Sequence, residues 1–311
     1  MLALAVASAT CWRVAPPTGR LRDNVGHQGE ELTYRLVNAA LRRRPEAIWW
    51  PRPLRWSTEL LNATLRDVKL AFGDDAPGCE RFATIKPQIK PPQWSSRDAH
   101  ATARKAVYAA CGLGAGRLKE LSVRVLGRDD ETPRRRDLCG GRLERRIADI
   151  EALRAATVRA ARRARRDVDF DVVNVSSRAP GDLCAQVARF ATADVLVSIH
   201  GAHLVNAPFL PPRGLLFEVL PWAHSKKRHH ARLLQRTDIS YDKLCGRRPA
   251  KASNIPTSES LCEGRSQAAR RCTAIVRDCH PTRMGTHPCV RPCDCIDHFE
   301  TRLVAFFARV S

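Results

Sequence analysis

Aromatic residues are scarce in this sequence, and long apolar segments are missing from it. Phe, Trp and Tyr make up 6% of the 311 residues, so a buried core must rest mainly on Leu, Val and Ala. The apolar start, MLALAVASATC, is too short to span a bilayer, and no later run is longer. We expect this start to be a signal remnant, part of a first strand or the edge of an incomplete gene model. If the protein is membrane-anchored in life, the anchor is expected to lie outside this sequence.

Acidic residues are also few compared with basic ones. The 32 Asp and Glu residues face 53 Lys and Arg residues, of which 9 are Lys, and the formal net charge is +21. Such an excess favours an anionic partner: nucleic acid, an anionic membrane surface or a phosphorylated ligand. Arg and Ala richness together also follows from genomic base composition, and no compact basic block with interleaved aromatics occurs. We therefore expect no nucleic-acid partner.

Cysteine, in contrast, is abundant. Half of the 12 Cys residues lie in the last 50 positions, and this density favours disulfides and an oxidising compartment. Glycosylation sequons at Asn62 and Asn174 agree with this. We expect the lumen of the endoplasmic reticulum or Golgi. Zinc binding by the tail is the alternative to disulfides, but Cys-x3-Cys-x-Cys is not a common structural zinc spacing. The residues concerned are His287, Cys289, Cys293, Cys295 and His298.

Strands that alternate with helices predict an α/β fold with mostly parallel sheets. We divide the chain into a first domain over 15–115, a second over 116–247 and a Cys-rich extension over 248–311. The expected helices cover residues 27–43, 96–110, 143–166 and 182–190, and the expected strands cover 48–50, 122–126, 170–175, 195–199 and 215–220. Prolines and glycines leave the segment 51–92 unassigned.

The most informative stretch is 193–221. It predicts a strand, a small-residue turn at His200-Gly201-Ala202, a short helix, a turn and a second strand that Glu218 interrupts. This order is a βαβ unit with a compact crossover. Ligands bind beyond the carboxyl ends of such strands, and the free N–H groups of a following helix favour phosphate. We therefore expect a nucleotide-linked substrate.

This stretch resembles the signature of glycosyltransferase family 61, which runs from His-Gly-Ala through an Asn and a Phe-Leu-Pro-Pro-x-Gly turn to Glu-x-x-Pro. The matching residues are His200, Gly201, Ala202, Asn206, Phe209 to Pro212, Gly214, Glu218 and Pro221. Weaker resemblance extends from Asn24 to about Gly246. The family includes protein O-mannose and EGF-domain N-acetylglucosaminyltransferases and plant xylan glycosyltransferases.

The resemblance implies two Rossmann-like domains facing across a cleft, the arrangement called GT-B. It also implies an inverting enzyme that moves a sugar from a nucleotide donor, for which we expect a UDP-sugar, to a hydroxyl of a protein or polysaccharide. The transfer must stabilise the leaving diphosphate and deprotonate the acceptor. We expect no obligate metal, since no Asp-x-Asp stands in a suitable position at a strand end.

For the donor site, the resemblance implies that His200 donates to a phosphate oxygen while Gly201 and Ala202 let the backbone approach it. Glu218 then accepts bonds from ribose hydroxyls; the alternatives are a His satisfied at a strand end and a salt bridge between Glu218 and an arginine. Asn206 either caps the helix or contacts the ligand. Arginines after strand 122–126 suit diphosphate because a guanidinium binds phosphate in a bidentate way. The candidates are Arg128, Arg134, Arg135 and Arg136, of which we retain Arg128 and Arg135.

The resemblance places the general base at the start of the first helix. His27 and Glu31 are four residues apart and share one helix face, so the carboxylate can orient the imidazole. The family usually carries Asp where this chain has Glu31. The alternative is an ordinary helix start with Asn24 as its cap.

Two other interpretations of the whole chain remain open. One is a catalytically inactive lumenal module that binds glycan or nucleotide with the same fold. The other is a basic nucleic-acid-binding protein. The cluster of His224, His229 and His230 favours a solvated or acceptor-facing loop rather than a metal site.

Overall fold

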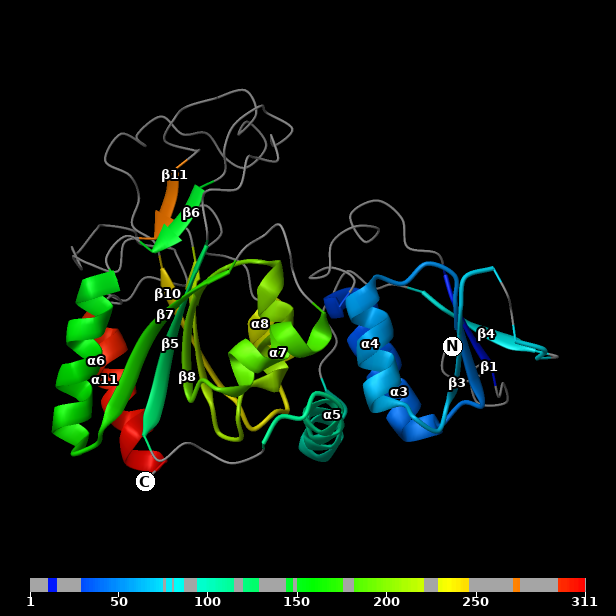
Figure 1. The fold of residues 1–311 in the computed structure, drawn as a ribbon, viewed down its shortest axis with the longest axis horizontal. Coiled ribbons are helices and arrows are strands. Elements are labelled where there is room, and N and C mark those ends of the chain that lie inside the picture. Colours follow the sequence, from blue (N-terminus) through cyan, green and yellow to red (C-terminus); the bar gives the residue numbers. More distant parts are fainter. Residues whose placement is uncertain are drawn as a thin grey trace, which may run out of the picture.

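The computed structural model describes the chain in segments. They are residues 11–15, 29–74, 77–79, 81–86, 94–114, 120–128, 144–147, 150–175, 182–220, 229–245, 271–274 and 296–310. Two main parallel sheets with helices packed against them make an α/β fold (Figure 1). Within these segments, none of the helices combines the length and hydrophobicity that a bilayer crossing requires.

The first sheet contains four parallel strands in the order β3-β2-β1-β4. They are β1 (Cys11–Val14), β2 (Ala47–Trp50), β3 (Lys69–Phe72) and β4 (Phe82–Ile85). Side chains alternate between the two faces, as the pleat requires. Trp12 and Ile48 pair in register and are buried, whereas Arg13, which stacks over Trp49, is exposed. The predicted strand at 48–50 is confirmed.

The helices of the first half are η2 (Gly29–Thr33, a π-helical turn), α3 (Tyr34–Arg43), α4 (Arg55–Thr64) and α5 (Arg97–Ala110). The predicted helices at 27–43 and 96–110 correspond to η2 with α3 and to α5. At the start of α5, the Ser96 hydroxyl accepts a bond from the Ala99 N–H at 3.0 Å, and Gly112 follows its end with φ +64°. Helix α4 was not predicted, because prolines surround it in the sequence. Pro51 and Pro53 precede its first residue, so they do not interrupt its backbone hydrogen bonds.

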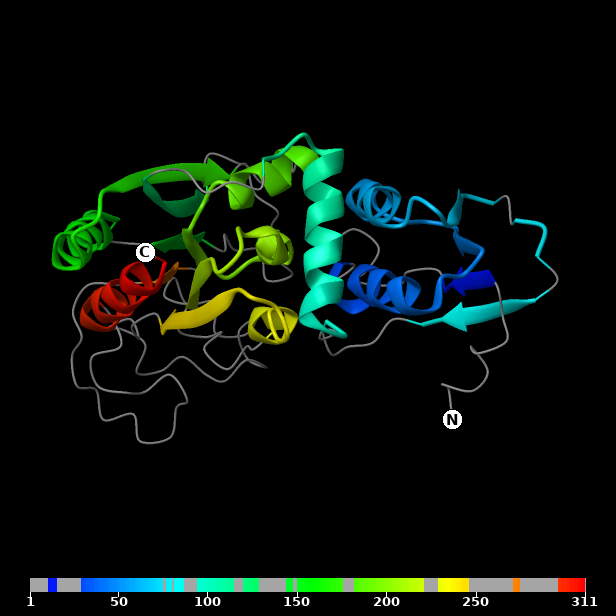
Figure 2. The same ribbon diagram turned by 90° about the horizontal axis from the view of Figure 1, so that it is seen from below.

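Helices α3, α4 and α5 lie between the two main sheets, and α5 crosses the molecule at their boundary (Figures 1 and 2). Their apolar faces pack on the first sheet around Trp12 and Trp50. The same hydrophobic cluster includes Val205 and Phe209, which belong to the second half of the chain. The first core therefore extends across the boundary between the sheets.

The second sheet contains five parallel strands in the order β10-β9-β8-β5-β7. They are β5 (Leu121–Arg128), β7 (Val168–Val175), β8 (Val195–Ile199), β9 (Leu215–Leu220) and β10 (Ser240–Cys245). All four strands predicted in this half are confirmed, and β10 is an additional edge strand. β8 and β9 are buried along their whole length, as expected for strands covered on both faces. A separate two-stranded sheet pairs β6 (Glu144–Ile147) with β11 (Arg271–Ala274).

The helices of this half are α6 (Ile150–Ala164), α7 (Leu183–Ala191), η3 (Ala202–Phe209, a 3₁₀-helix), α8 (His229–Leu233) and α11 (Ile296–Arg309). Helices α6 and α11 cover one face of the sheet, and α7, η3 and α8 cover the other (Figure 1). The predicted helix at 143–166 was wrong at its start, because residues 144–147 form β6. Helix α7 is confirmed, and its N-cap Asp182 accepts a bond from the Ala185 N–H at 2.8 Å.

The terminal helix α11 belongs to the second core, although the sequence placed it in a Cys-rich extension. Phe299, Leu303 and Phe307 are each fully buried in the cluster formed by α6 and the sheet. The ring of Phe299 meets that of Phe217 edge to face, with centroids 4.8 Å apart. Strand β9 is therefore buried on this face by the last helix of the chain.

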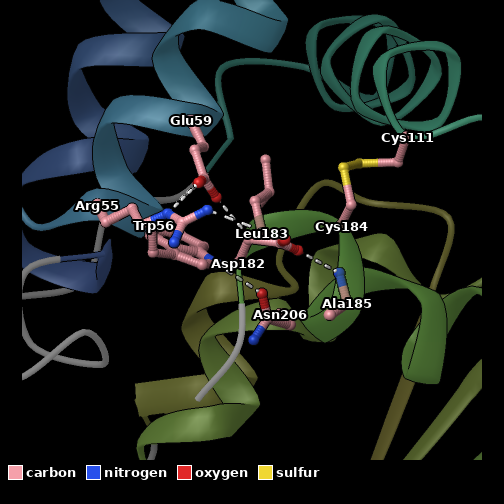
Figure 3. The surroundings of a disulfide bond; sticks show 9 residues. All are labelled: Arg55, Trp56, Glu59, Cys111, Asp182, Leu183, Cys184, Ala185 and Asn206. Carbon is pink, nitrogen blue, oxygen red and sulfur yellow. Dashed lines mark hydrogen bonds and ion pairs between the residues drawn. A yellow bond between two sulfur atoms is a disulfide. The ribbon is translucent and has the colours of Figure 1, made fainter. Parts of the chain in front are cut away.

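Two disulfides connect segments distant in sequence. Cys11 bonds to Cys79, and Cys111 bonds to Cys184, with sequence separations of 68 and 73 residues. The second joins the end of α5 to the start of α7 and thus links the two halves (Figure 3). The expectation of disulfides is confirmed at these four cysteines. The tail cysteines, for which disulfides or zinc were expected, lie outside the described side chains.

Candidate functional site

The order of the second sheet marks one place for a ligand. The chain leaves β5 toward β7 on one side and returns to β8 on the other, so the connections after β5 and β8 run in opposite directions. In open α/β sheets, ligands bind at such a switch point, outside the carboxyl ends of the two strands. Arg128 ends β5, and His200 directly follows β8. Both candidates therefore flank the switch point.

A hydrogen-bonded cluster holds the His200 imidazole at this position. Glu218 Oε1 accepts bonds from His200 Nδ1 at 2.5 Å and from His230 Nδ1 at 2.6 Å. The Tyr241 hydroxyl donates to Glu218 Oε2 at 2.7 Å. Because an ionised carboxylate only accepts hydrogen bonds, both Nδ1 atoms carry a proton. The His200 ring can then reach a ligand only through Nε2.

The charge of this cluster is buried behind His200. Glu218 is 1% exposed and the His230 side chain 2%, whereas that of His200 is 14% exposed. Burial alone raises the pKa of Glu218, but the charges and hydrogen bonds of His230 and His200 outweigh it and hold that pKa well below its usual range. Glu218 is therefore an ionised carboxylate that fixes two imidazoles, of which His200 has the most access to solvent.

The turn after His200 is packed by its own side chains. The His200 N–H donates to the Val219 carbonyl at 2.9 Å, which binds the turn to β9. A Cβ at Gly201 would lie 2.9 Å from the His203 ring, so this ring occupies the space that a glycine leaves. His203 Nε2 shares a hydrogen bond of 2.7 Å with the Ser198 hydroxyl. The absence of a side chain at Gly201 thus accommodates His203, while Ala202 is exposed.

Asn206 connects the two halves of the molecule. It is fully buried, and its Oδ1 accepts a bond from Trp56 Nε1 of α4 at 2.9 Å (Figure 3). Its Nδ2 donates to Gln186 Oε1 at 3.1 Å and to the His203 carbonyl at 3.0 Å. These bonds use both ends of the amide, so Asn206 joins α4, α7 and η3.

The carbonyls of η3 and the residue after it accept side-chain bonds from the helices of the first half. The bonds are Tyr34 Oη to Val205 O at 2.7 Å, His100 Nε2 to Pro208 O at 2.7 Å, Tyr108 Oη to Phe209 O at 2.8 Å and Arg104 Nη1 to Leu210 O at 3.3 Å. A 3₁₀-helix that contains a proline leaves several carbonyls without a partner in its own backbone. Here, side-chain donors from α3 and α5 bond to these carbonyls. We call this set of contacts, together with the Trp56–Asn206 bond, the seam.

A pocket of about 360 Å³ opens beside the seam, lined by parts of α4, α5 and α7. Its wall includes Glu59, whose Oε2 accepts a bond from the Leu183 N–H at 2.5 Å and so supplies an anion to the first turn of α7. The Cys111–Cys184 disulfide forms another side (Figure 3). None of the candidate site residues predicted from the sequence lines this pocket.

The sequence model of the glycosyltransferase 61 family matches residues 96–216. This part of the chain is similar to glycosyltransferase family 61. The match indicates a glycosyltransferase, a class whose substrates are a nucleotide sugar and an acceptor. A comparison with curated proteins finds no match to the chain.

The family 61 match begins with α5 and ends in β9, so it covers the switch point and most of the seam. His200, Gly201, Ala202 and Asn206 lie inside the matched range. Glu218, His230 and Tyr241 lie beyond it, although Glu218 contacts His200 directly.

Two roles expected from the family 61 resemblance need correction. Glu218 was expected to accept ribose hydroxyls, but its buried oxygens are engaged by His200, His230 and Tyr241, so it positions an imidazole instead. Asn206 was expected to cap η3 or contact a ligand. It is 0% exposed and bonded to three groups of the protein, so it is a structural residue.

The other expected site residues are not described in full. His27 and Arg135 lie outside the described residues, and for Glu31 and Arg128 only the backbone is described. Glu31 belongs to η2, and Arg128 ends β5. The base and the arginine therefore stay predictions.

Sequence reasoning missed His230 and Tyr241. His230 was assigned to a solvated loop, but it lies in α8 with its side chain buried against Glu218. Nothing in the sequence around it signals a buried position, since Lys226, Lys227 and Arg228 precede it. Tyr241 lies on β10, which was not predicted, and the pairing of β10 with β9 places it on the same sheet face as Glu218.

Proposed function

We propose that this protein is an inverting glycosyltransferase that moves a sugar from a nucleotide donor, a UDP-sugar, to a hydroxyl of a protein or glycan. The two parallel sheets are taken to act as the two Rossmann-like domains of a GT-B enzyme. The observation that carries the proposal is the position of His200: it follows β8 at the switch point, inside the family match, with its ring fixed by Glu218.

The fixed imidazole suits the leaving diphosphate. Departure of a nucleoside diphosphate builds negative charge on phosphate oxygens, and donors held in place before the reaction stabilise that charge without reorganisation. When its ring is doubly protonated, His200 would donate from Nε2 to such an oxygen while its Nδ1–H stays bonded to Glu218. An arginine from the 128–136 segment, Arg128 or Arg135, would supply a bidentate contact to the same group.

The acceptor side of the proposal rests on the resemblance. His27, oriented by Glu31, would remove the proton of the acceptor hydroxyl in a single displacement that inverts the anomeric carbon. The two disulfides support an oxidising compartment, and we place the enzyme in the lumen of the endoplasmic reticulum or Golgi.

A thermal-shift panel of nucleotide sugars tests the donor site. We expect one donor class to stabilise the protein selectively, by about 2.7 kcal/mol at a ligand concentration of 100 Kd. His200→Ala should abolish this stabilisation. His298→Ala is the matched control, because His298 also bonds to a carboxylate, Asp242, at 3.1 Å, and Asp242 belongs to the edge strand β10, two strands away from β8.

Two outcomes would contradict the proposal. If no nucleotide sugar shifts the unfolding temperature, the donor assignment fails. If His200→Ala binds the donor as tightly as the wild-type protein, the donor lies elsewhere. Selective binding without transfer to any acceptor and without donor hydrolysis would instead favour the inactive lumenal module.

A further inference from the structure

Three potential metal ligands converge behind the switch point. One ligand atom from each of His200, Glu218 and His230 lies within 4.8 Å of the other two, and both Nδ1 atoms are bonded to Glu218 Oε1. They come from three different elements: the turn after β8, strand β9 and helix α8. We propose that His200, Glu218 and His230 bind a divalent transition-metal ion, for which Zn²⁺ is the best fit.

The donor set favours zinc over the hard cations. Mg²⁺ and Ca²⁺ prefer oxygen ligands, whereas imidazole suits Zn²⁺ and the neighbouring transition metals. Two imidazoles and one carboxylate are also the set found in a class of catalytic zinc sites, where the three protein ligands leave a fourth position for water or substrate. Because His200 is the most exposed of the three, this open position would lie on its side of the cluster.

The geometry requires only small movements to accept an ion. With metal–ligand distances of about 2.1 Å and tetrahedral angles, neighbouring ligand atoms lie about 3.4 Å apart. The two nitrogen–oxygen distances are now 2.5 and 2.6 Å, because the imidazoles donate to the carboxylate. Shifts of about 0.8 Å in these distances, with the ring protons transferred to Nε2 or released, would form the site.

The surroundings of the cluster resemble those of a metal site in a second respect. Carboxylates that bind metal are usually held by hydrogen bonds from a second layer of residues. Here the Tyr241 hydroxyl donates to Glu218 Oε2 at 2.7 Å and leaves Oε1 toward the imidazoles. Glu218 and His230 are almost completely buried, so the ligands are already ordered before an ion arrives.

An ion at this place would add positive charge next to the proposed diphosphate site. This link to catalysis rests on the proposed function, but metal binding itself does not. The inference differs from the expectation of no obligate metal, which rested on the lack of a suitably placed Asp-x-Asp, and from the expectation that His230 lies in a solvated or acceptor-facing loop. Metal binding and donor binding can be measured separately, so failure of one is distinguishable from failure of the other.

The experiment titrates the metal-free, full-length protein with Zn²⁺ and Co²⁺. We expect one equivalent of Zn²⁺ bound by calorimetry and by elemental analysis after gel filtration, and a visible Co²⁺ spectrum of four-coordinate nitrogen and oxygen ligation. His230→Ala should weaken binding by more than the 10- to 100-fold that second-layer changes cause. Tyr241→Phe retains all three ligands and the ring, and should weaken it by about 10-fold.

The Cys- and His-containing tail is the competing zinc site, and variants separate the two. Metal held by the tail would survive His230→Ala, would be sensitive to His298→Ala and would give a thiolate Co²⁺ spectrum. Metal held by the proposed site would be lost in His230→Ala, would be retained in His298→Ala and would give a Co²⁺ spectrum without thiolate ligation. Wild-type protein that binds no stoichiometric Zn²⁺ or Co²⁺, or binding unchanged in both His230→Ala and Tyr241→Phe, would overturn the proposal.

Discussion

Replacement of Asp238 by Asn should weaken the attachment of α5 to the second half of the molecule. Both oxygens of Asp238 accept bonds from Arg104, from Nη1 at 2.7 Å and from Nη2 at 2.8 Å. Arg104 is 7% exposed, so its guanidinium depends on this carboxylate for charge compensation. In Asp238→Asn, the charge is lost and the amide NH₂ faces a guanidinium N–H, so two donors oppose each other.

The size of the effect follows from the partial burial of the pair. Breaking a buried ion pair destabilises a protein by about 3–5 kcal/mol, and an exposed pair contributes about 0–1 kcal/mol. The Asp238 side chain is 31% exposed and that of Arg104 8%. We therefore expect Asp238→Asn to lower the free energy of unfolding by about 2 kcal/mol. Urea unfolding at pH 7 measures this change.

The pH dependence gives the same prediction an independent check. Burial raises the pKa of Asp238, but the hydrogen bonds and charge of Arg104 outweigh this, and the carboxyl pKa lies below its usual value. A depressed folded-state pKa means that the stabilisation is complete above the unfolded pKa of about 3.9 and is lost below it. The difference between wild type and Asp238→Asn should thus narrow as pH falls below about 4. His100, which lies 3.6 Å from Asp238, is buried with its pKa lowered to about 4, so it stays neutral above about pH 4.

An exposed ion pair provides the control for these measurements. Glu151 lies 3.5 Å from Arg154 on α6 and its side chain is 80% exposed. Glu151→Gln should change the unfolding free energy by less than about 0.5 kcal/mol. A loss in Asp238→Asn no larger than that of this control, or a difference that persists undiminished at pH 3, would refute the reasoning.

Two further predictions concern stability. Replacement of both Cys111 and Cys184 by Ala opens a loop of 73 residues, and the chain-entropy estimate gives a loss of about 4 kcal/mol; an equal urea midpoint for the variant and the oxidised wild type would contradict it. Gly29→Ala should destabilise by about 1–3 kcal/mol, since a Cβ there would lie 2.3 Å from Val205 Cγ2. Gly78→Ala, whose Cβ would meet nothing within 4 Å, is its control, and equal melting temperatures for the two alanine variants would argue against close packing at Gly29.

The regular elements could be predicted where local signals and burial agree. The strands β8 and β9 stand out as apolar runs bounded by turn residues, and Ser96 and Asp182 mark helix starts by their capping side chains. Helix α4 was missed because its neighbourhood is rich in proline. The start of α6 was misplaced because the basic residues of 144–147 suit an exposed helix as well as a short strand. Local propensity cannot decide whether residues 144–147 form a helix or a strand, because their pairing with β11, 127 residues later in the sequence, makes them a strand.

For the candidate site, sequence could identify the turn but not its environment. His200 and Glu218 were found because His200 directly follows one apolar strand and Glu218 interrupts the next, at the spacing of the family 61 signature, and the structure brings them into contact. The role of Glu218 was misassigned because the prediction assumed that ribose hydroxyls of a ligand donate to this buried carboxylate. In the structure, His230 and Tyr241 of the protein itself donate to it. Those contacts depend on how α8 and β10 fold back onto β9. The packing of α8 and β10 against β9 could not be predicted from the sequence alone.

The position of α11 affects how the protein can be synthesised. Phe299 and Leu303 complete the hydrophobic layer behind β9, although some 80 residues separate that strand from the helix. On the ribosome, α6 can cover part of this face early, but the part that α11 covers stays exposed until residues 296–309 have emerged. Most of the first core can form earlier, because α3, α4 and α5 precede the second sheet in the sequence, although Val205 and Phe209 join it later. Chaperones are therefore expected to be needed most while the second half of the chain is being synthesised.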